Sequence, residues 1–262
     1  MSRYAAMFER LAAKGEGAFG AFLMLGDPHI ERSAGLLDAV VAGGADMVEV
    51  GIPFSDPVAD GPVIQAAGQR ALAAGVKVRD CFDLIRGFRD RHPYVPVGIL
   101  TYANLVMARI GFARDAAEAG TDSILIADVP TLEAEPYVRQ MEQAGVEPVL
   151  IAAANTPDAA LARVAALSKA YTYCVSRTGI TGTHSDGTFD STLPAKLKAA
   201  GAPPAVFGFG ISKPEHVREA IAAGAAGVIS GSAIVDCVAR GGDVQALVRS
   251  LKAATRNDSS PR

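Results

Sequence analysis

The sequence predicts an α/β fold, a (β/α)8 TIM barrel, because eight short β-like runs alternate with longer helical patterns along 262 residues. Several helical patterns close on a glycine just before the next strand, as in AAEAGTDSILIAD and AIAAGAAGVISG. This phrase is an internal repeat of about 25 to 45 residues, as successive βα units give. An open sheet of eight strands would carry more covering elements, so we expect closure into a barrel.

The expected strands are short, apolar and bounded by turn residues. In chain order they are Gly20–Met24, Asp46–Val50, Val95–Leu100, Ser123–Ile126, Pro148–Ile151, Tyr171–Val175, Ala205–Gly208 and Gly227–Ile229. Between them, apolar residues at three- and four-residue spacing predict helices. Examples are Glu31–Ala42, Val63–Ala74, Gly111–Ala119, Glu133–Ala144 and Pro214–Ala223.

Two further helical segments are expected as additions to the barrel. The amphipathic segment Ser2–Lys14 precedes the first strand, where an extra N-terminal helix would cover the barrel floor, and Lys77–Arg91 inserts a helix after the second strand. Residues 255–262 are polar, and we expect a disordered tail there. No linker divides the chain, so we expect a single TIM-barrel domain over residues 1–262.

The composition excludes several classes of partner. The chain carries 25 Lys and Arg against 28 Asp and Glu, a net charge of −3, and lacks the broad positive field that nucleic acids or membrane surfaces require. It has neither the apolar block of a signal peptide nor a run of roughly 18 apolar residues, so we expect a cytoplasmic protein. Cys81, Cys174 and Cys237 are far apart in apolar segments, which favours buried thiols over disulfides.

Three consecutive turns after the last strands are rich in glycine: 178–182, 207–212 and 229–233. In this fold the turns after strands seven and eight commonly form a phosphate site. Glycine amides are not blocked by side chains, and a serine hydroxyl at a helix start adds a donor where the helix dipole favours an anion. We therefore expect phosphate binding by Gly182, Gly208, Gly210, Gly231 and Ser232, the alternative being that these glycines merely permit tight turns.

Glu49 interrupts an otherwise apolar strand. Strand alternation places it on the same face as Met47, opposite Val48 and Val50. If that face is the barrel interior, burial raises the pKa of the carboxyl and suits it to proton transfer near neutral pH. The alternative is a glutamate at a strand end with its carboxylate in water.

Two aspartates follow in a loop stiffened by prolines, Asp56 and Asp60. Either could cap a turn, the commonest use of Asp in such a loop. Two acids near one barrel mouth also allow one to exchange protons while the other stays ionised and accepts a hydrogen bond.

The residues that several other catalytic mechanisms require are missing from the sequence. No expected strand carries a lysine at its carboxyl end for Schiff-base chemistry, and the four histidines are dispersed rather than clustered as zinc ligands. A G-x-G-x-x-G turn for a nicotinamide cofactor is missing after the early strands. Acid–base chemistry on a phosphorylated compound, with no cofactor and no metal, is the remaining expectation.

Several motifs together resemble the tryptophan synthase α-subunit family. They are VEVGIPFSDPVADGPVIQ at 48–65, ADVP at 127–130, YTYCVSRTGITG at 171–182, GFGIS at 208–212 and GAAGVISGSAIV at 224–235. The resemblance extends from about Arg3 to Lys252. It implies a lyase of tryptophan biosynthesis that cleaves indole-3-glycerol phosphate to indole and glyceraldehyde 3-phosphate. Glu49 matches the family's proton-transferring glutamate, and Asp60 matches the aspartate that holds the indole N–H.

The same resemblance implies an apolar indole pocket and a partner. The pocket positions are Phe22, Leu100, Tyr102, Leu125, Ala127, Ile151, Tyr173 and Phe209, each of which alone would more often be a core residue. Arg177 and Thr181 lie on the loop that in the family closes over the substrate and brings Thr181 towards Asp60. The implied partner is a PLP-dependent β subunit in an α2β2 complex, and the positions that match its contact surface are Pro53, Asp56 and Asn104.

Two other interpretations of the sequence remain open. A stand-alone indole-3-glycerol phosphate lyase that releases free indole would carry the same catalytic residues. A catalytically silent phosphate-binding barrel that regulates a partner is a third possibility, although the presence of both Glu49 and Asp60 disfavours it.

Overall fold

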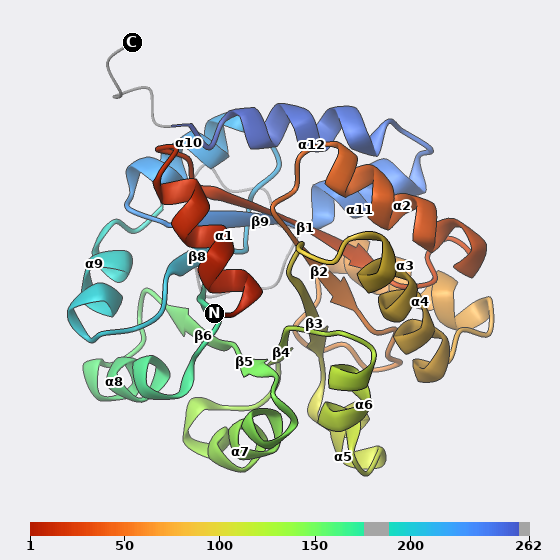
Figure 1. The fold of residues 1–262 in the computed structure, drawn as a ribbon, viewed down its shortest axis with the longest axis horizontal. Coiled ribbons are helices and arrows are strands. Elements are labelled where there is room, and N and C mark those ends of the chain that lie inside the picture. The colour runs from red at the N-terminus through yellow and green to blue at the C-terminus, as the bar shows by residue number, and fades with distance from the viewer. Residues whose placement is uncertain (176–188, 257–262) are drawn as a thin grey trace.

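The structure, a computed structural model, describes residues 1–175 and 189–256. Its strands form one parallel sheet in the order β5-β4-β3-β2-β1-β9-β8-β7-β6. Their bounds are β1 Ala18–Met24, β2 Met47–Gly51, β3 Val97–Thr101, β4 Ser123–Ile126, β5 Glu147–Pro148, β6 Leu150–Ala153, β7 Thr172–Val175, β8 Ala205–Phe207 and β9 Gly227–Ser230. Helices surround this sheet on its outer side (Figure 1).

The sheet closes through its fifth strand. β5 pairs with β4 and β6 pairs with β7, and only Val149 separates β5 from β6 in the chain. The expected strand Pro148–Ile151 is therefore present but interrupted. Pro148 has no N–H to donate, and the Leu150 N–H bonds the Ser168 hydroxyl rather than a strand. The interrupted strand joins both halves of the sheet and confirms the predicted (β/α)8 barrel.

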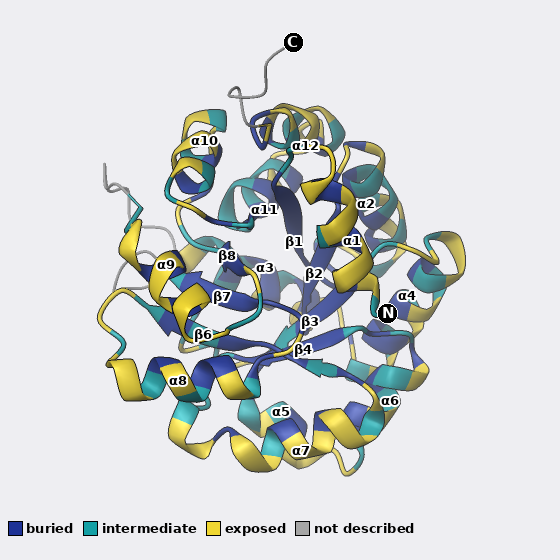
Figure 2. Ribbon diagram, turned by 60° about the vertical axis from the view of Figure 1, so that its left-hand side comes forward, coloured by how far each residue is buried: buried dark blue, intermediate teal, exposed yellow. Residues whose placement is uncertain are grey.

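The helices bury one face against the strands and expose the other, as Figure 2 shows. They are α1 Arg3–Ala12, α2 Ile30–Ala42, α3 Pro62–Ala73, α4 Val78–Arg91, α5 Ala103–Ala108, α6 Phe112–Glu118, η1 Thr131–Glu133 (3-10), α7 Glu135–Ala144, α8 Asp158–Leu167, α9 Thr192–Ala199, α10 Pro214–Ala222, α11 Ser232–Ala239 and α12 Val244–Ala253. Within the described part of the chain, every helix is too short or too polar to cross a membrane. The inserted helix after the second strand is confirmed as α4.

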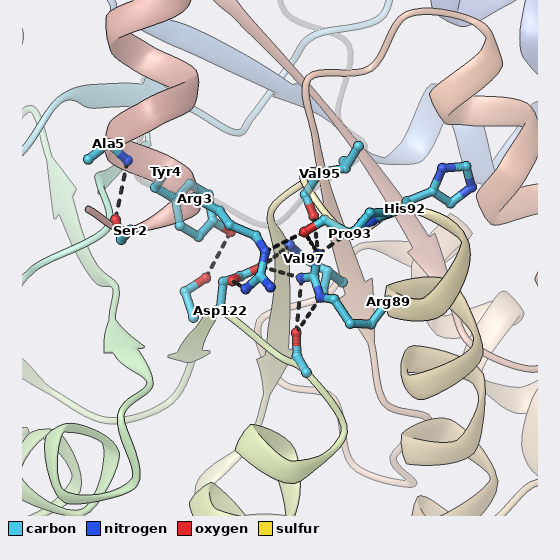
Figure 3. A network of polar contacts seen from close by, with 12 residues as sticks. Ser2, Arg3, Tyr4, Ala5, Arg89, His92, Pro93, Val95, Val97 and Asp122 are labelled. Atoms are coloured by element: carbon cyan, nitrogen blue, oxygen red, sulfur yellow. Dashed lines mark hydrogen bonds and ion pairs between the residues drawn. The ribbon is translucent and has the colours of Figure 1, made fainter.

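The extra N-terminal helix α1 covers the barrel floor, as predicted (Figure 1). The Arg3 guanidinium pairs with Asp122 at 2.7 Å (Figure 3). The Tyr4 hydroxyl shares a 2.9 Å hydrogen bond with Oγ of Ser123, a residue of β4. The Tyr4 ring also lies 5.4 Å from the ring of Tyr171. These contacts bring the N-terminal helix into the lower end of the barrel interior.

The beginning of the expected tail is ordered. Thr255 is fully buried, and its carbonyl accepts a hydrogen bond from the Gly17 N–H. Arg256 pairs with Glu16 at 3.3 Å. The expectation of disorder was therefore wrong for these two residues, because they return to the segment before β1; residues 257–262 lie outside the described part of the chain.

Apolar side chains form two layers, one between strands and helices and one inside the barrel. Val48 and Val50 belong to the outer layer, whereas Met47 belongs to the inner one. Glu49 is 3% exposed and bonds a residue of the inner layer, Tyr171. The prediction that Glu49 shares the interior face with Met47 is thus confirmed.

Candidate active site

Glu49 lies on β2 with its carboxyl inside the barrel, and burial raises its pKa from 4.5 to about 7. A 3.0 Å hydrogen bond from the Tyr171 hydroxyl to Oε1 opposes this rise, because it stabilises the carboxylate. The nearby charge of Asp60 raises the pKa further. Near neutral pH both protonation states are accessible, so this group can both donate and accept a proton.

Asp60 ends the loop between β2 and α3 and is 8% exposed. Burial raises its pKa to about 6, and the nearby Tyr102 hydroxyl partly offsets this rise. Among the described residues, the Tyr102 hydroxyl has no well-aligned hydrogen-bond partner. At neutral pH Asp60 is therefore the more acidic of the two coupled carboxyls and Glu49 the more basic.

Most residues expected to line an apolar pocket do come together in the inner layer. Phe22 lies opposite Glu49 in the β1–β2 register, Leu100 opposite Leu125, and Ile151 opposite Tyr173. The members of this group in one cluster are Phe22, Leu100, Leu125, Ala127, Ile151, Tyr173 and Phe209. Tyr102 differs, because its buried ring stacks on Phe54 at 5.3 Å beside Asp60.

Two of the glycine-rich turns, the ones after β8 and β9, lie at the same end of the barrel. The Gly208 N–H donates to the Cys174 carbonyl, and the Tyr173 hydroxyl donates to the Gly208 carbonyl at 3.1 Å. A Cβ at Gly208 would lie 1.9 Å from the Tyr173 ring, so glycine is required there by packing. Gly210 has a φ of +77°, which favours glycine.

Gly231 precedes α11, and Ser232 is the first residue of that helix. No described side chain caps this helix end, so its first N–H groups point out of the helix without a side-chain acceptor. A Cβ at Gly231 would lie 3.7 Å from Phe22, which places the turn before α11 beside the apolar cluster. Arg177, Thr181 and Gly182 lie outside the described residues.

The residues expected at a partner surface differ in exposure. Asp56 and Asn104 are exposed, whereas Pro53 is buried. Large apolar side chains are exposed in the segments that follow β2, β3 and β4: Val58, Met107, Ile110 and Leu132. These segments begin at the carboxyl ends of their strands, as do the segments that contain Asp60 and Tyr102. The exposed apolar side chains therefore lie around the barrel mouth.

Sequence reasoning missed three residues of the site. Tyr171 was assigned only to a strand, yet it bonds Glu49. Ile64 belongs to the inner apolar cluster, and Gln65 bonds the main chain of Asp60 at 2.7 Å. Ile64 and Gln65 lie within the 48–65 motif, and their position just after Asp60 is the sequence signal that could have identified them. Within the described residues, no three His, Cys, Asp or Glu side chains come together as metal ligands would.

A closed (β/α)8 barrel with two buried, coupled carboxyls at its mouth defines a class of barrel proteins suited to acid–base chemistry. The sequence profile described as "Tryptophan synthase alpha chain" matches residues 8–259. The chain therefore belongs to the tryptophan synthase alpha chain family.

Individual relatives agree with this assignment. The tryptophan synthase alpha chain of Vibrio cholerae is 48% identical over 241 residues, which cover 91% of this chain and 90% of the relative. That of Shewanella amazonensis is 51% identical over 239 residues, 90% of each chain. Among solved structures, tryptophan synthase from Mycobacterium tuberculosis gives a TM-score of 0.89 at 28% identity, with 98% of this chain and 99% of that one covered.

Proposed function

We propose that this chain cleaves indole-3-glycerol phosphate to indole and glyceraldehyde 3-phosphate as an acid–base retro-aldol lyase. The observation that carries the proposal is the buried pair Glu49 and Asp60, whose pKa values lie near 7 and 6, beside an apolar slot. Membership of the tryptophan synthase alpha chain family supports the same reaction.

Glu49 moves the proton in this mechanism. Cleavage of the bond to indole C3 requires a proton at that carbon and loss of the proton from the side-chain hydroxyl that becomes the aldehyde. A single carboxyl with a pKa of about 7 can perform both transfers in turn, because neither protonation state is strongly disfavoured at neutral pH. The Tyr171 hydroxyl holds one carboxylate oxygen at 3.0 Å, which leaves the other to face the substrate.

Asp60 stabilises the positive charge that develops on the indole ring. Protonation at C3 makes the indole ring nitrogen positive, and a fixed carboxylate that accepts the N–H lowers the energy of that state. Because Asp60 is buried, its interaction with this charge is screened less than it would be in water. The lower pKa of Asp60 keeps it ionised while Glu49 carries the proton.

The remaining residues bind the two ends of the substrate. The apolar slot around Phe22, Leu125 and Tyr173 suits a flat indole ring, because its lining side chains are buried and largely apolar. We assign the phosphate to the turns at Gly210, Gly231 and Ser232, together with Gly182, which lies outside the described residues. Gly208 would serve this site by making room for Tyr173, since its N–H is already bonded.

We further propose that the tryptophan synthase β subunit covers the barrel mouth. The exposed apolar side chains Val58, Met107, Ile110 and Leu132 surround that mouth together with the exposed Asp56 and Asn104. Several large apolar side chains exposed around one opening are typical of a protein–protein contact. Pro53 would act from below the surface by stiffening the loop that carries Asp56.

Indole release measured on the purified chain, with and without an added β subunit, tests the proposal. We expect indole and glyceraldehyde 3-phosphate in equal amounts, and stimulation by the β subunit. Strong release without any stimulation would favour the stand-alone lyase. A lack of release under both conditions, with phosphate compounds still bound, would favour a silent regulatory barrel. Glu49→Gln should abolish turnover while largely sparing substrate binding.

A further inference from the structure

Both main-chain polar groups of Asp60 are held by hydrogen bonds. The Asp60 N–H donates to the Pro57 carbonyl at 3.1 Å, within the same loop. The Asp60 carbonyl accepts a 2.7 Å hydrogen bond from Nε2 of Gln65, one turn into α3. The second bond is the one that ties this residue to a helix.

The Gln65 side chain donates to the Asp60 carbonyl, which has no partner within the helix. Gly61 is the N-cap residue of α3, and its carbonyl accepts the first helical hydrogen bond, from the Gln65 N–H at 2.9 Å. Asp60 precedes the N-cap, so its carbonyl lies outside the helical ladder. Since Asp60 is 8% exposed, loss of the side-chain donor would leave this carbonyl poorly satisfied and its peptide free to rotate.

The helix that carries Gln65 is itself anchored to the barrel. Near its C-terminal end, the Arg70 guanidinium donates two hydrogen bonds to the Asp27 carboxylate, at 2.7 and 2.9 Å. Ile64 packs in the inner apolar cluster, and Gly68 lies against Met24 of β1. The Gln65 amide is therefore presented from a helix with little freedom to move.

We propose that Gln65 is a positioning residue for Asp60, setting the direction of its carboxylate by fixing its peptide to α3. The proposal rests on the proposed role of Asp60 as acceptor of the indole N–H. That role depends on orientation, because a misplacement of about 1 Å in a reacting group can cost about a hundredfold in rate. The effect of Gln65 on turnover therefore passes through the Asp60 carboxylate.

A double-mutant comparison on the full chain tests this dependence. Gln65→Met keeps the size of the side chain and removes the donor; we expect kcat for indole release to fall about tenfold while KM changes less than about threefold, since the phosphate end is unaffected. In an Asp60→Asn background, the same Gln65→Met change should alter kcat less than about twofold. Gln69→Met is the matched control, because Gln69 is exposed on the same helix and should leave activity unchanged.

Two outcomes would overturn the proposal. One is a wild-type kcat in folded Gln65→Met; the other is an equal loss of kcat in the Asp60→Asn background, which would show a general structural effect. Circular dichroism establishes folding, and if Gln65→Met does not fold, Gln65→Asn carries the same comparison with a shortened donor. Absence of indole release by the wild-type chain would instead reject the proposed function, so the two failures are distinguishable.

Discussion

Tyr171 and Glu49 meet across the barrel interior, with the Tyr171 hydroxyl 3.0 Å from Oε1 of Glu49 and 122 positions separating them in the chain. Below them, the Tyr4 ring packs on Tyr171, so the N-terminal helix contacts the site from the floor. Burial raises the pKa of Glu49 and this bond lowers it. The pKa of the proposed catalytic acid is therefore raised by burial and by the charge of Asp60 and lowered by the Tyr171 bond, which a mutation can remove by itself.

Tyr171→Phe should raise the pKa of Glu49 further, because it removes the donor that stabilises the carboxylate. A hydrogen bond to a charged group contributes about 1.5 kcal/mol, which corresponds to about one pKa unit. We expect the limb of the kcat–pH profile that belongs to Glu49 to move about one unit towards alkaline pH. An unchanged limb would mean that the bond does not persist during turnover.

Glu49→Gln should change how stability depends on pH. The pKa of Glu49 is raised in the folded state, from 4.5 to about 7, so its contribution is fully present below about pH 4.5 and is lost as the pH rises through about 7. This loss is on the order of 3 kcal/mol. Urea unfolding at pH 5 and pH 8 should show a steeper decline for the wild type than for Glu49→Gln. Parallel declines would contradict the raised pKa.

Gly98→Ala should destabilise the floor beneath the site. Gly98 lies opposite Glu49 in the β2–β3 register, and a Cβ there would stand 2.5 Å from Ser123 Oγ and 2.9 Å from the Tyr4 hydroxyl. We expect a loss of about 1–3 kcal/mol in the free energy of unfolding. Gly35→Ala is the control, since nothing lies near its added carbon in α2, and it should stabilise by about 0.5–1 kcal/mol. Equal effects of both changes would refute the steric explanation.

Ser232→Ala should weaken substrate binding more than turnover. The hydroxyl stands at the first position of α11, where helix N–H groups and the dipole favour an anion. We expect KM for indole-3-glycerol phosphate to rise about tenfold, in line with the loss of one charge-assisted hydrogen bond, with little change in kcat. The analogue indole-3-glycerol, which lacks the phosphate, should not distinguish the variant from the wild type. An equal penalty on that analogue would place the phosphate elsewhere.

Local patterns predicted most of the fold and part of the site. Period-two alternation placed Glu49 on the interior face, and helical spacing predicted α1 and α4, because these patterns depend on neighbours a few residues away. The break at Val149 escaped prediction, since it depends on the Ser168 hydroxyl that takes the Leu150 N–H. The order of Thr255 was missed for a similar reason, because its partner Gly17 lies at the other end of the chain.

The amino-acid sequence alone established the acidic residues at positions 49 and 60, the glycine-rich turns and the alternation of strands with helices. These features could be predicted because residue chemistry and local periodicity are properties of short segments. Whether those two acids share one environment could not be predicted in this way. Closure of the barrel brings Tyr171 to Glu49 and Tyr102 to Asp60, and it removes both carboxyls from water. Their pKa values near neutrality are a product of that long-range packing, since desolvation exists only once distant segments surround the group.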